Sequence, residues 1–262
     1  MTKAEFANYF GTYTAWSGYC LDVALLAIAS WVLYGFKKHR MDDATQNKVL
    51  IGAALSLLAG LSCAFLFDAF FTGDWRTWCR LSEKRFGFTF AGGLIGFLLA
   101  LSLWGHFSGI GGRFLLNFFL PSMALAQAIG RIGCFIGGCC YGCESDFGVE
   151  YPPGSFPYSL LGSVKLFPVQ LVESGCLFLL FFICLITEFF SRAAVYLIGV
   201  GLIRFWLEFF RGDIRGDMFG IEIFSPQQIL SILFIVIGVI LLYRKSRYTK
   251  PGRFSLDGTI EQ

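Results

Sequence analysis

About seven stretches of this sequence are apolar over roughly 20 residues, the length that an α-helix needs to cross the ~30 Å hydrocarbon core of a bilayer. Only 15% of the 262 residues are charged, against about 25% in a typical soluble domain. We therefore predict an all-α, polytopic membrane protein that forms a single integral membrane domain over residues 1–262. The predicted spans are 15–36, 49–71, 88–106, 114–138, 171–190, 193–210 and 225–243.

The basic residues predict how these spans are oriented, because loops rich in lysine and arginine stay on the cytoplasmic side. Basic residues follow the first and the last predicted spans, and others lie in loops predicted to face the same side. They are Lys37, Lys38, Arg40, Arg113, Arg192, Arg244 and Lys245. An odd number of spans places the termini on opposite sides, so we expect an external N-terminus and a cytoplasmic C-terminus. The net charge of +3 gives no support for a nucleic-acid partner.

Two segments between the predicted spans are long enough to form structure of their own. The first, 72–87, is basic although it falls on the side predicted to be external, and we expect a small arm that lies against lipid headgroups. The second, 139–168, is polar and rich in proline and glycine. Its length and its predicted external position make it the candidate for a lid or a partner-binding surface.

Several ionisable residues fall inside the predicted spans, where each costs about 2.5–3.5 kcal/mol. They are Asp22, Asp68, Arg131, Glu173, Arg204 and Glu208, with Arg211 at an outer edge. Charges at this depth usually face a partner, water or a ligand. For Asp22 we expect a partner on another helix or on the backbone, and for Asp68 either packing or a place in the same cavity as the arginines.

The arginines allow two interpretations. Arg204 and Glu208 are four residues apart and share one helix face, which suits a structural ion pair. Arg131 favours a ligand site, since glycines flank it and leave room beside the guanidinium. A guanidinium offers a planar fork that matches two phosphate oxygens at once. Arginines at similar depth therefore predict a site for the phosphate of a lipid headgroup in the external half of the membrane.

Five motifs, in the same order along the chain, resemble those of the prolipoprotein diacylglyceryl transferase family. The family pattern GRxGNFxNxExxG is kept at Gly130, Arg131, Gly133, Phe135 and Gly142. HGGLIG reads here from Ala91 to Gly96, HPxQLYE from Phe167 to Glu173, RxxxEFFR from Arg204 to Arg211, and GQILS from Gln227 to Ser231. Each motif alone is weak, but their common order over roughly residues 50–243 indicates relatedness.

The resemblance implies an enzyme of the bacterial cytoplasmic (inner) membrane. Such an enzyme takes phosphatidylglycerol from the membrane lipids and transfers its diacylglyceryl group to the lipobox cysteine of a prolipoprotein signal peptide. Glycerol-1-phosphate leaves, and no metal or other cofactor is expected. The chemistry is consistent with this, because arginines stabilise a leaving phosphate and the acceptor thiol needs a base or a positive field to lose its proton.

The resemblance also implies roles for matched positions. The catalytic set is Arg131, Arg204 and Glu208, with Glu208 orienting Arg204, and the substrate-binding set is Arg211, Gln170, Glu173, Gly92, Gly93, Gly142 and Cys139. The arginines would hold the lipid phosphate, and the glycines would permit close helix approach and headgroup access.

The chain departs from the family pattern at its acid–base positions. Ala91 replaces the histidine before GGLIG, Cys134 and Gly137 replace the signature asparagines, and Cys139 replaces the signature glutamate. The two histidines, His39 and His106, fall near the predicted cytoplasmic face. These departures predict a divergent member. Alternatives to transfer onto a lipoprotein are a lipid-headgroup transferase with another acceptor, a non-catalytic lipid-binding protein and a redox-linked membrane protein.

A cluster of cysteines, Cys134, Cys139, Cys140 and Cys143, falls where the fourth span meets the external surface. The spacing is a poor match to a zinc site. Close packing as small apolar side chains and a disulfide, either Cys140–Cys143 or one of these with Cys79, remain open. So does a functional thiol, because Cys139 near Arg131 is in a position to act as nucleophile or base if its pKa is lowered.

Overall fold

A computed structural model describes residues 3–72, 90–212 and 225–248, with some side chains in these ranges left out. Seven helical segments in the described residues are long and apolar enough to cross a membrane. The helices that form them are α1 (Lys3–Lys38), α2 (Asp43–Thr72), α3 (Phe90–Phe107), α4 (Gly112–Gly137), α6 (Val169–Ile186), α7 (Arg192–Leu207) and α8 (Pro226–Tyr248). The prediction of a polytopic helical membrane protein is confirmed.

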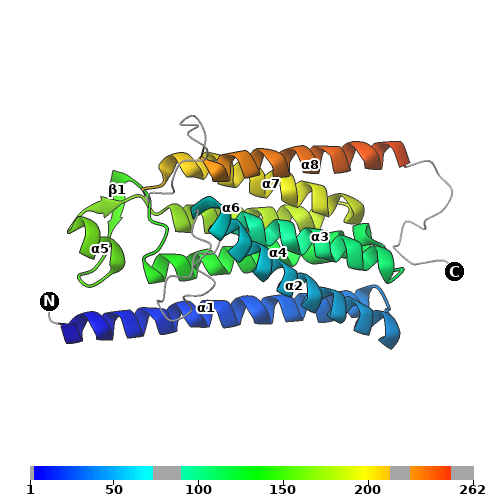
Figure 1. Cartoon of the computed structure of the whole chain (residues 1–262), viewed down its shortest axis with the longest axis horizontal. Helices are drawn as coiled ribbons and strands as arrows, with labels where there is room; N and C mark the ends of the chain where they lie inside the picture. The colour runs from blue at the N-terminus through cyan, green and yellow to red at the C-terminus, as the bar shows by residue number, and fades with distance from the viewer. Residues whose placement is uncertain (1–2, 73–89, 213–224, 249–262) are drawn as a thin grey trace.

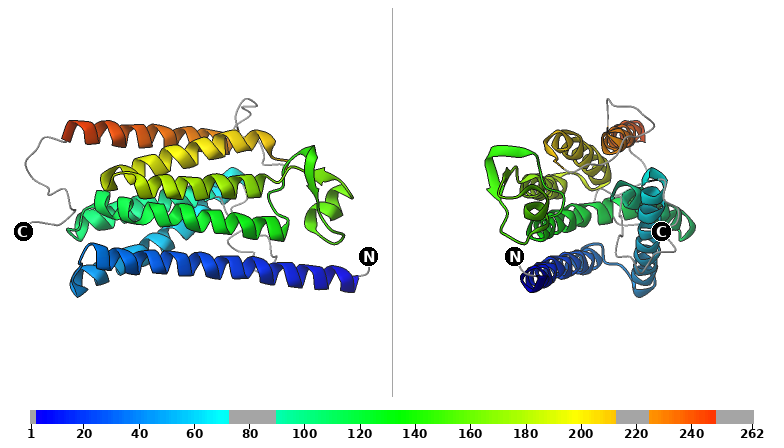
Figure 2. Two further views of the ribbon diagram at one scale, coloured as in Figure 1. Left: turned by 180° about the vertical axis from the view of Figure 1, so that it is seen from behind. Right: turned by 60° about the vertical axis from the view of Figure 1, so that its left-hand side comes forward.

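Helix α4 lies at the centre of the bundle. It packs against α1, α3, α6 and α7, while α2 packs on α3 and α8 on α7. Figure 1 shows α1 along one edge of the bundle and α8 along the opposite edge, and the turned views in Figure 2 agree. The two helices after α4 in this core, α6 and α7, are therefore both in contact with it and with each other.

A small mixed unit lies at one end of the bundle, on the left in Figure 1. Strand β1 (Glu144–Glu150) pairs antiparallel with β2 (Lys165–Leu166), and the short helix α5 (Phe156–Leu161) lies between them in the chain. The unit is tied to α6 and α7 through backbone hydrogen bonds on both sides of Cys143: its N–H donates to Phe210 O over 3.0 Å, and the Phe167 N–H donates to its carbonyl over 2.8 Å. It occupies the segment predicted as a lid or partner-binding surface, a role that stays a prediction.

Helix boundaries differ from the predicted ones at the two ends of α7, where the chain forms 3-10 turns. The break between the fifth and sixth spans falls at Thr187 and Glu188, followed by the 3-10 turn η2 (Phe189–Ser191), so Arg192 begins α7. At its other end α7 stops at Leu207, and η3 (Glu208–Phe210) is a 3-10 turn. Helices often end in a 3-10 turn, because the turn gives hydrogen-bond partners to carbonyl groups of the last helical residues. Glu208 therefore lies outside the regular α-helix of Arg204.

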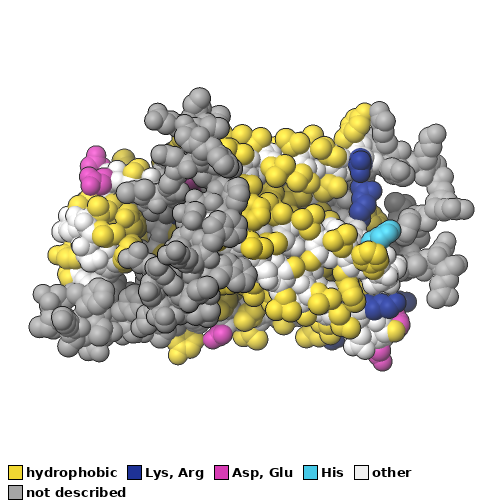
Figure 3. Space-filling view, in the orientation of Figure 1, with side chains coloured by type: hydrophobic (Ala, Val, Ile, Leu, Met, Phe, Trp, Pro, Cys, Tyr) yellow, Lys and Arg dark blue, Asp and Glu magenta, His cyan; other side chains and the backbone are white. Residues whose placement is uncertain are grey.

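The outer surface of the bundle is apolar, and its charges gather at the ends. Figure 3 shows hydrophobic side chains over the middle of one face and lysine, arginine and histidine at the right-hand end. Asp22 is an exception, since its side chain is exposed on α1 and has no partner among the described residues, so the expected pairing is not seen there. The side chain of Asp68 and the predicted arm, apart from Thr72, lie outside what is described.

Glycines on α3 allow α2 to approach closely. A Cβ added at Gly92 would lie 2.6 Å from Cβ of Phe67 and 2.9 Å from the carbonyl oxygen of Cys63, and one at Gly93 would lie 3.3 Å from Cβ of Ala64. Two of these neighbours are fixed parts of α2, so the helices would have to separate. This close approach agrees with the packing role expected for these glycines.

We predict that Gly92→Ala lowers the stability of the bundle by about 1–3 kcal/mol, because the added methyl group overpacks the α2–α3 contact. Gly175→Ala is the matched control, since Gly175 lies on α6 with nothing within 4 Å of an added Cβ. This control should leave stability unchanged or slightly higher, because alanine favours helix. Thermal unfolding in detergent measures both, and equal melting temperatures for the two variants would contradict the prediction.

Candidate functional site

One carboxylate joins two arginines from different helices inside the bundle. Arg131 Nε on α4 lies 3.0 Å from Oε2 of Glu173 on α6, and Arg204 Nε on α7 lies 2.8 Å from Oε1 of the same residue. The side chains are 10%, 1% and 6% exposed for Arg131, Glu173 and Arg204. Each helix of the α4–α6–α7 core contributes one member, so the sequence-predicted Arg131, Arg204 and Glu173 do converge.

Neighbouring polar contacts hold these helices in register. Ser174, beside Glu173, donates a hydrogen bond to the carbonyl of Ala128, one turn before Arg131, over 2.8 Å. On the other side of α4, the Gln127 amide donates to the Tyr196 hydroxyl of α7. Both contacts are buried or partly buried, where a hydrogen bond is costly to lose. They fix the depth at which the three charged side chains meet.

The three residues of this cluster are two guanidinium groups and one carboxylate. Arg204 has a further interaction besides those with Glu173 and Phe90. A charge buried in a low-dielectric interior is expensive unless it is paired. Arg131, whose polar contact is the shared carboxylate, is therefore the member of the cluster suited to an anionic ligand.

Arg131 has hydrogen-bond donors that no described residue uses. Among the described residues its side chain has one polar partner, Glu173, which it contacts through Nε. Its terminal nitrogens are thus available for a ligand in the fork geometry that suits phosphate. Beside it, a Cβ added at Gly130 would meet nothing within 4 Å, which agrees with the room expected next to this arginine.

Arg204 is held on a second side by an aromatic ring. Its guanidinium carbon lies 4.4 Å from the ring centre of Phe90, the first residue of α3, a cation–π contact. The next residue, Ala91, is fully buried in the apolar core with Leu94 and Leu120. At the position where the family motif has histidine, this chain thus has core packing.

The predicted site residues Gln170 and Gly142 are parts of the framework around the cluster. Gln170 is fully buried, and its amide donates to the carbonyl of Cys139 over 2.7 Å and to the Tyr151 hydroxyl over 3.1 Å. A Cβ at Gly142 would lie 2.3 Å from the carbonyl oxygen of Phe167, so only glycine fits there. Gly142 also forms a backbone bridge with Arg211, which ties the Arg211 segment to the end of α4.

Glu208 was predicted to orient Arg204. One contact of its carboxylate is with Ser225, whose hydroxyl donates to Oε1 over 2.9 Å. Glu173 was not predicted to orient Arg204, but its carboxylate contacts Arg204 because α6 packs against α7. A catalytic role for Glu208 stays a prediction.

The cysteines beside this cluster are free thiols. Cys134, Cys139, Cys140 and Cys143 form no disulfide with one another in the described residues, and Cys79 lies outside them. The described part of the chain contains no group arranged to hold a metal ion. Cys140 adopts a positive φ of 60°, unusual for a residue with a side chain, and this turn brings its thiol within reach of those of Cys134 and Cys139.

The thiols at the end of α4 differ in acidity. Hydrogen bonds from the thiols of Cys134 and Cys139, and then the positive charges of Arg211 and Arg131, lower the pKa of Cys140 in spite of its burial. The pKa of Cys139 is raised by its hydrogen bonds to Cys134 and Cys140 and by burial. The sequence left open a functional thiol at Cys139, but the thiol whose pKa is lowered is that of Cys140.

Comparisons with known proteins agree with this geometry. Residues 8–244 match the family model described as prolipoprotein diacylglyceryl transferase. The chain is 34% identical over 246 residues to the phosphatidylglycerol–prolipoprotein diacylglyceryl transferase of Clostridium tetani, a match that covers 89% of this chain and 94% of the relative. It is 30% identical over 230 residues to phosphatidylglycerol–prolipoprotein diacylglyceryl transferase 2 of Clostridium perfringens, covering 83% and 86%.

We predict that Glu173→Gln destabilises the protein by about 3–5 kcal/mol, because it leaves two buried guanidinium groups without their shared counter-charge. Glu144→Gln is the control, since Glu144 is an exposed residue of β1 and its loss should cost less than about 0.5 kcal/mol. Unfolding midpoints in detergent measure the difference. Equal midpoints for the two variants would show that the shared carboxylate contributes nothing to stability.

We also predict that iodoacetamide alkylates Cys140 faster than Cys139 near pH 6.5, since the thiolate is the reactive form. A thiol with a raised pKa should slow about tenfold for each unit that the pH falls, whereas a thiol with a lowered pKa keeps its rate. Tandem mass spectrometry of the folded chain in detergent, from pH 6.5 to 8.5, separates the two sites. A rate at Cys140 that falls in step with that at Cys139 would contradict the assignment.

Proposed function

This chain belongs to the prolipoprotein diacylglyceryl transferase family, and we propose that it transfers the diacylglyceryl group of phosphatidylglycerol to the lipobox cysteine thiol of a prolipoprotein. The observation that carries the proposal is the buried cluster in which Glu173 bridges Arg131 and Arg204. It places two guanidinium groups inside a membrane bundle and leaves the terminal nitrogens of Arg131 available as donors. Those are the properties that recognition of a phosphodiester headgroup requires.

The proposed reaction replaces a carbon–oxygen bond with a carbon–sulfur bond. The acceptor sulfur attacks the glycerol carbon of the diacylglyceryl group, and the bond from that carbon to the phosphate oxygen breaks. Glycerol-1-phosphate leaves with the electron pair of that bond. Negative charge therefore grows on the phosphate oxygens as the bond breaks, and guanidinium groups already in place stabilise it without reorganisation.

Glu173 is a positioning residue in this proposal. Both of its oxygens face arginine Nε atoms, so it sets the separation and the rotation of the two guanidinium groups. Arg204 is restrained further by the ring of Phe90. Orientation of this kind matters because binding groups that are already in the productive geometry lower the barrier to reaction.

The acceptor thiol must also lose its proton. Ala91 has no group that accepts one, but nearby guanidinium groups, such as that of Arg131, favour the thiolate form of a cysteine held beside them. Arg211 lies near the same end of α4, where it acts on Cys140. We therefore assign activation of the acceptor to the positive field of the arginines rather than to a histidine base.

The orientation in the membrane follows from the basic residues. Lys38, Arg113 and Arg244 lie at the ends of α1, α4 and α8 that are remote from the cluster, and the positive-inside rule assigns that end to the cytoplasm. The arginine cluster would then belong to the external half of the membrane. A prolipoprotein that has entered the membrane through its signal peptide would present its cysteine there.

One observation favours a second candidate function. Core packing at Ala91, where the family motif has histidine, is consistent with a chain that binds the lipid and does not transfer it. In that case the arginine cluster would retain phosphatidylglycerol without turnover.

An assay of purified enzyme with phosphatidylglycerol and a lipobox peptide separates the two candidates. We expect release of glycerol phosphate together with a peptide heavier by the diacylglyceryl group. We expect Arg131→Gln to reduce the rate by about 10²–10³-fold, as losing one oxyanion donor does. Arg113→Gln, at an exposed position remote from the cluster, should keep the rate. Lipid binding without release would identify the second candidate, and full activity of Arg131→Gln would contradict both.

A further inference from the structure

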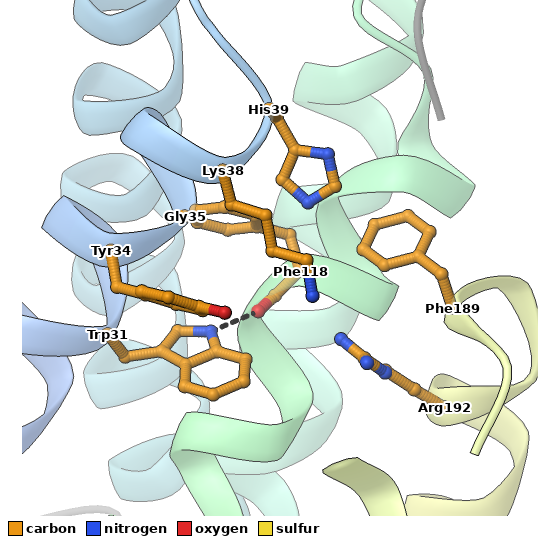
Figure 4. A pocket seen from close by; sticks show the side chains of 8 residues that line it. All are labelled: Trp31, Tyr34, Gly35, Lys38, His39, Phe118, Phe189 and Arg192. Carbon is orange, nitrogen blue, oxygen red and sulfur yellow. Dashed lines mark hydrogen bonds between the residues drawn. The ribbon is translucent and has the colours of Figure 1, made fainter. Parts of the chain in front are cut away.

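A second group of basic side chains lines a pocket at the end of the bundle remote from the arginine cluster. The pocket lies between the end of α1, the start of α4 and the junction of η2 with α7, and its polar lining residues are Tyr34, Lys38, His39 and Arg192 (Figure 4). Arg192 begins α7, and Arg204 follows about three turns later, roughly 18 Å along the helix. The pocket is therefore separate from the proposed catalytic site.

Arg192 is fixed in place by the protein. The residue is 8% exposed, its Nε donates to the carbonyl of Thr187 over 3.3 Å, and its Nη2 donates to the carbonyl of Leu185 over 3.2 Å. Its guanidinium carbon also lies 5.5 Å from the ring centre of Phe189. Its Nη1 has no hydrogen-bond partner among the described residues, so one face of a buried, oriented guanidinium stays available to a ligand.

Other polar groups point to the same space. In Figure 4 the ammonium group of Lys38 and the hydroxyl of Tyr34 are directed toward the guanidinium of Arg192. The indole nitrogen of Trp31 is already engaged, since it donates to the carbonyl of Phe118 over 2.7 Å. The pocket lining includes no carboxylate, and the nearest one in sequence, Glu188, is exposed and outside it.

The histidine at the rim, His39, is partly buried beside both cations. Burial, then the charges of Lys38 and Arg192, lower the pKa of His39. Its ring packs on Phe189 and Phe114 with centres 5.1 and 5.4 Å apart. Two cations that converge without a carboxylate repel each other, and an anion between them would remove that repulsion.

We propose that this pocket binds the phosphate group of an anionic membrane lipid at the basic end of the bundle. An arginine fork, an ammonium group and a phenol hydroxyl together match the oxygens of a phosphate. The enclosed part of the hollow is small, about 10 Å³, roughly the space that one water molecule needs. A phosphate group would therefore place an oxygen in the hollow, and the rest of the group would stay at its mouth.

The surroundings favour a lipid over a soluble phosphate. Exposed apolar side chains continue from the pocket toward the middle of the bundle on the two adjacent helices, with Leu33 on α1 and Phe182 and Ile186 on α6 exposed by 62%, 58% and 87%. Trp31 and Phe181 pack with ring centres 6.0 Å apart, which confirms that these helices are neighbours here. Acyl chains could lie along this surface, while tryptophan and tyrosine mark the headgroup level.

Binding to the delipidated full chain in neutral detergent tests the proposal. Native mass spectrometry would count the molecules bound during titration with dihexanoyl phosphatidic acid, and a parallel titration would use inorganic phosphate as competitor. Lys38→Gln and Tyr34→Phe remove single groups from the pocket without disturbing the contacts of Arg192 with α6. Arg113→Gln is the matched control, because it removes one positive charge at an exposed position of the same end.

In the Arg131→Gln variant, which disables the site of the proposed function, we expect one saturable lipid. Its affinity should fall on the order of tenfold when Lys38→Gln is added, as loss of a charge-assisted hydrogen bond predicts, and less than twofold when Arg113→Gln is added. Equal losses in Lys38→Gln and Arg113→Gln, or loss of the lipid in Arg131→Gln alone, would overturn the proposal. Displacement by inorganic phosphate at a concentration equal to that of the lipid would overturn the lipid assignment and identify a soluble anion. None of these outcomes depends on transferase activity.

Discussion

The sharing of one buried carboxylate by two arginines is the interaction around which this structure is organised. Glu173 is 1% exposed and faces Arg131 and Arg204 with one oxygen each. Separating such charges in a low-dielectric interior is expensive, so α4, α6 and α7 must meet at one depth and with one rotation. In the proposed function the same residues bind the phosphate of a lipid, which would link the packing of the core directly to substrate recognition.

The rest of the fold serves to keep this cluster in position. Hydrogen bonds from Ser174 to Ala128 and from Gln127 to Tyr196 set the depth of the helices. At the end of the bundle, Gln170 connects the turn after α4 with Tyr151 of the small mixed unit. Because each brace joins segments that are distant in sequence, the site is rigid only when the whole bundle is assembled.

Charge is distributed unequally between the two ends of the bundle, and this has a functional consequence. One end has two arginines inside the core, where both contact Glu173. The other has Lys38 and Arg192 around a shallow pocket beside apolar, exposed helix surfaces. Phosphate groups of membrane lipids are the most abundant anions that can approach either end from within a bilayer. The two proposed sites would therefore bind one type of headgroup for two different uses.

Sequence alone determined what must lie in the membrane and which buried charges needed an explanation, since helix length and the cost of a charge in lipid are local properties. The spans and the importance of Arg131 and Arg204 follow from them. Only the tertiary structure decided that Glu173 contacts both Arg131 and Arg204, that strands form between α4 and α6, and that Arg192 meets Lys38. These outcomes depend on how distant helices rotate and pack against one another, and spacing along a single chain does not encode that.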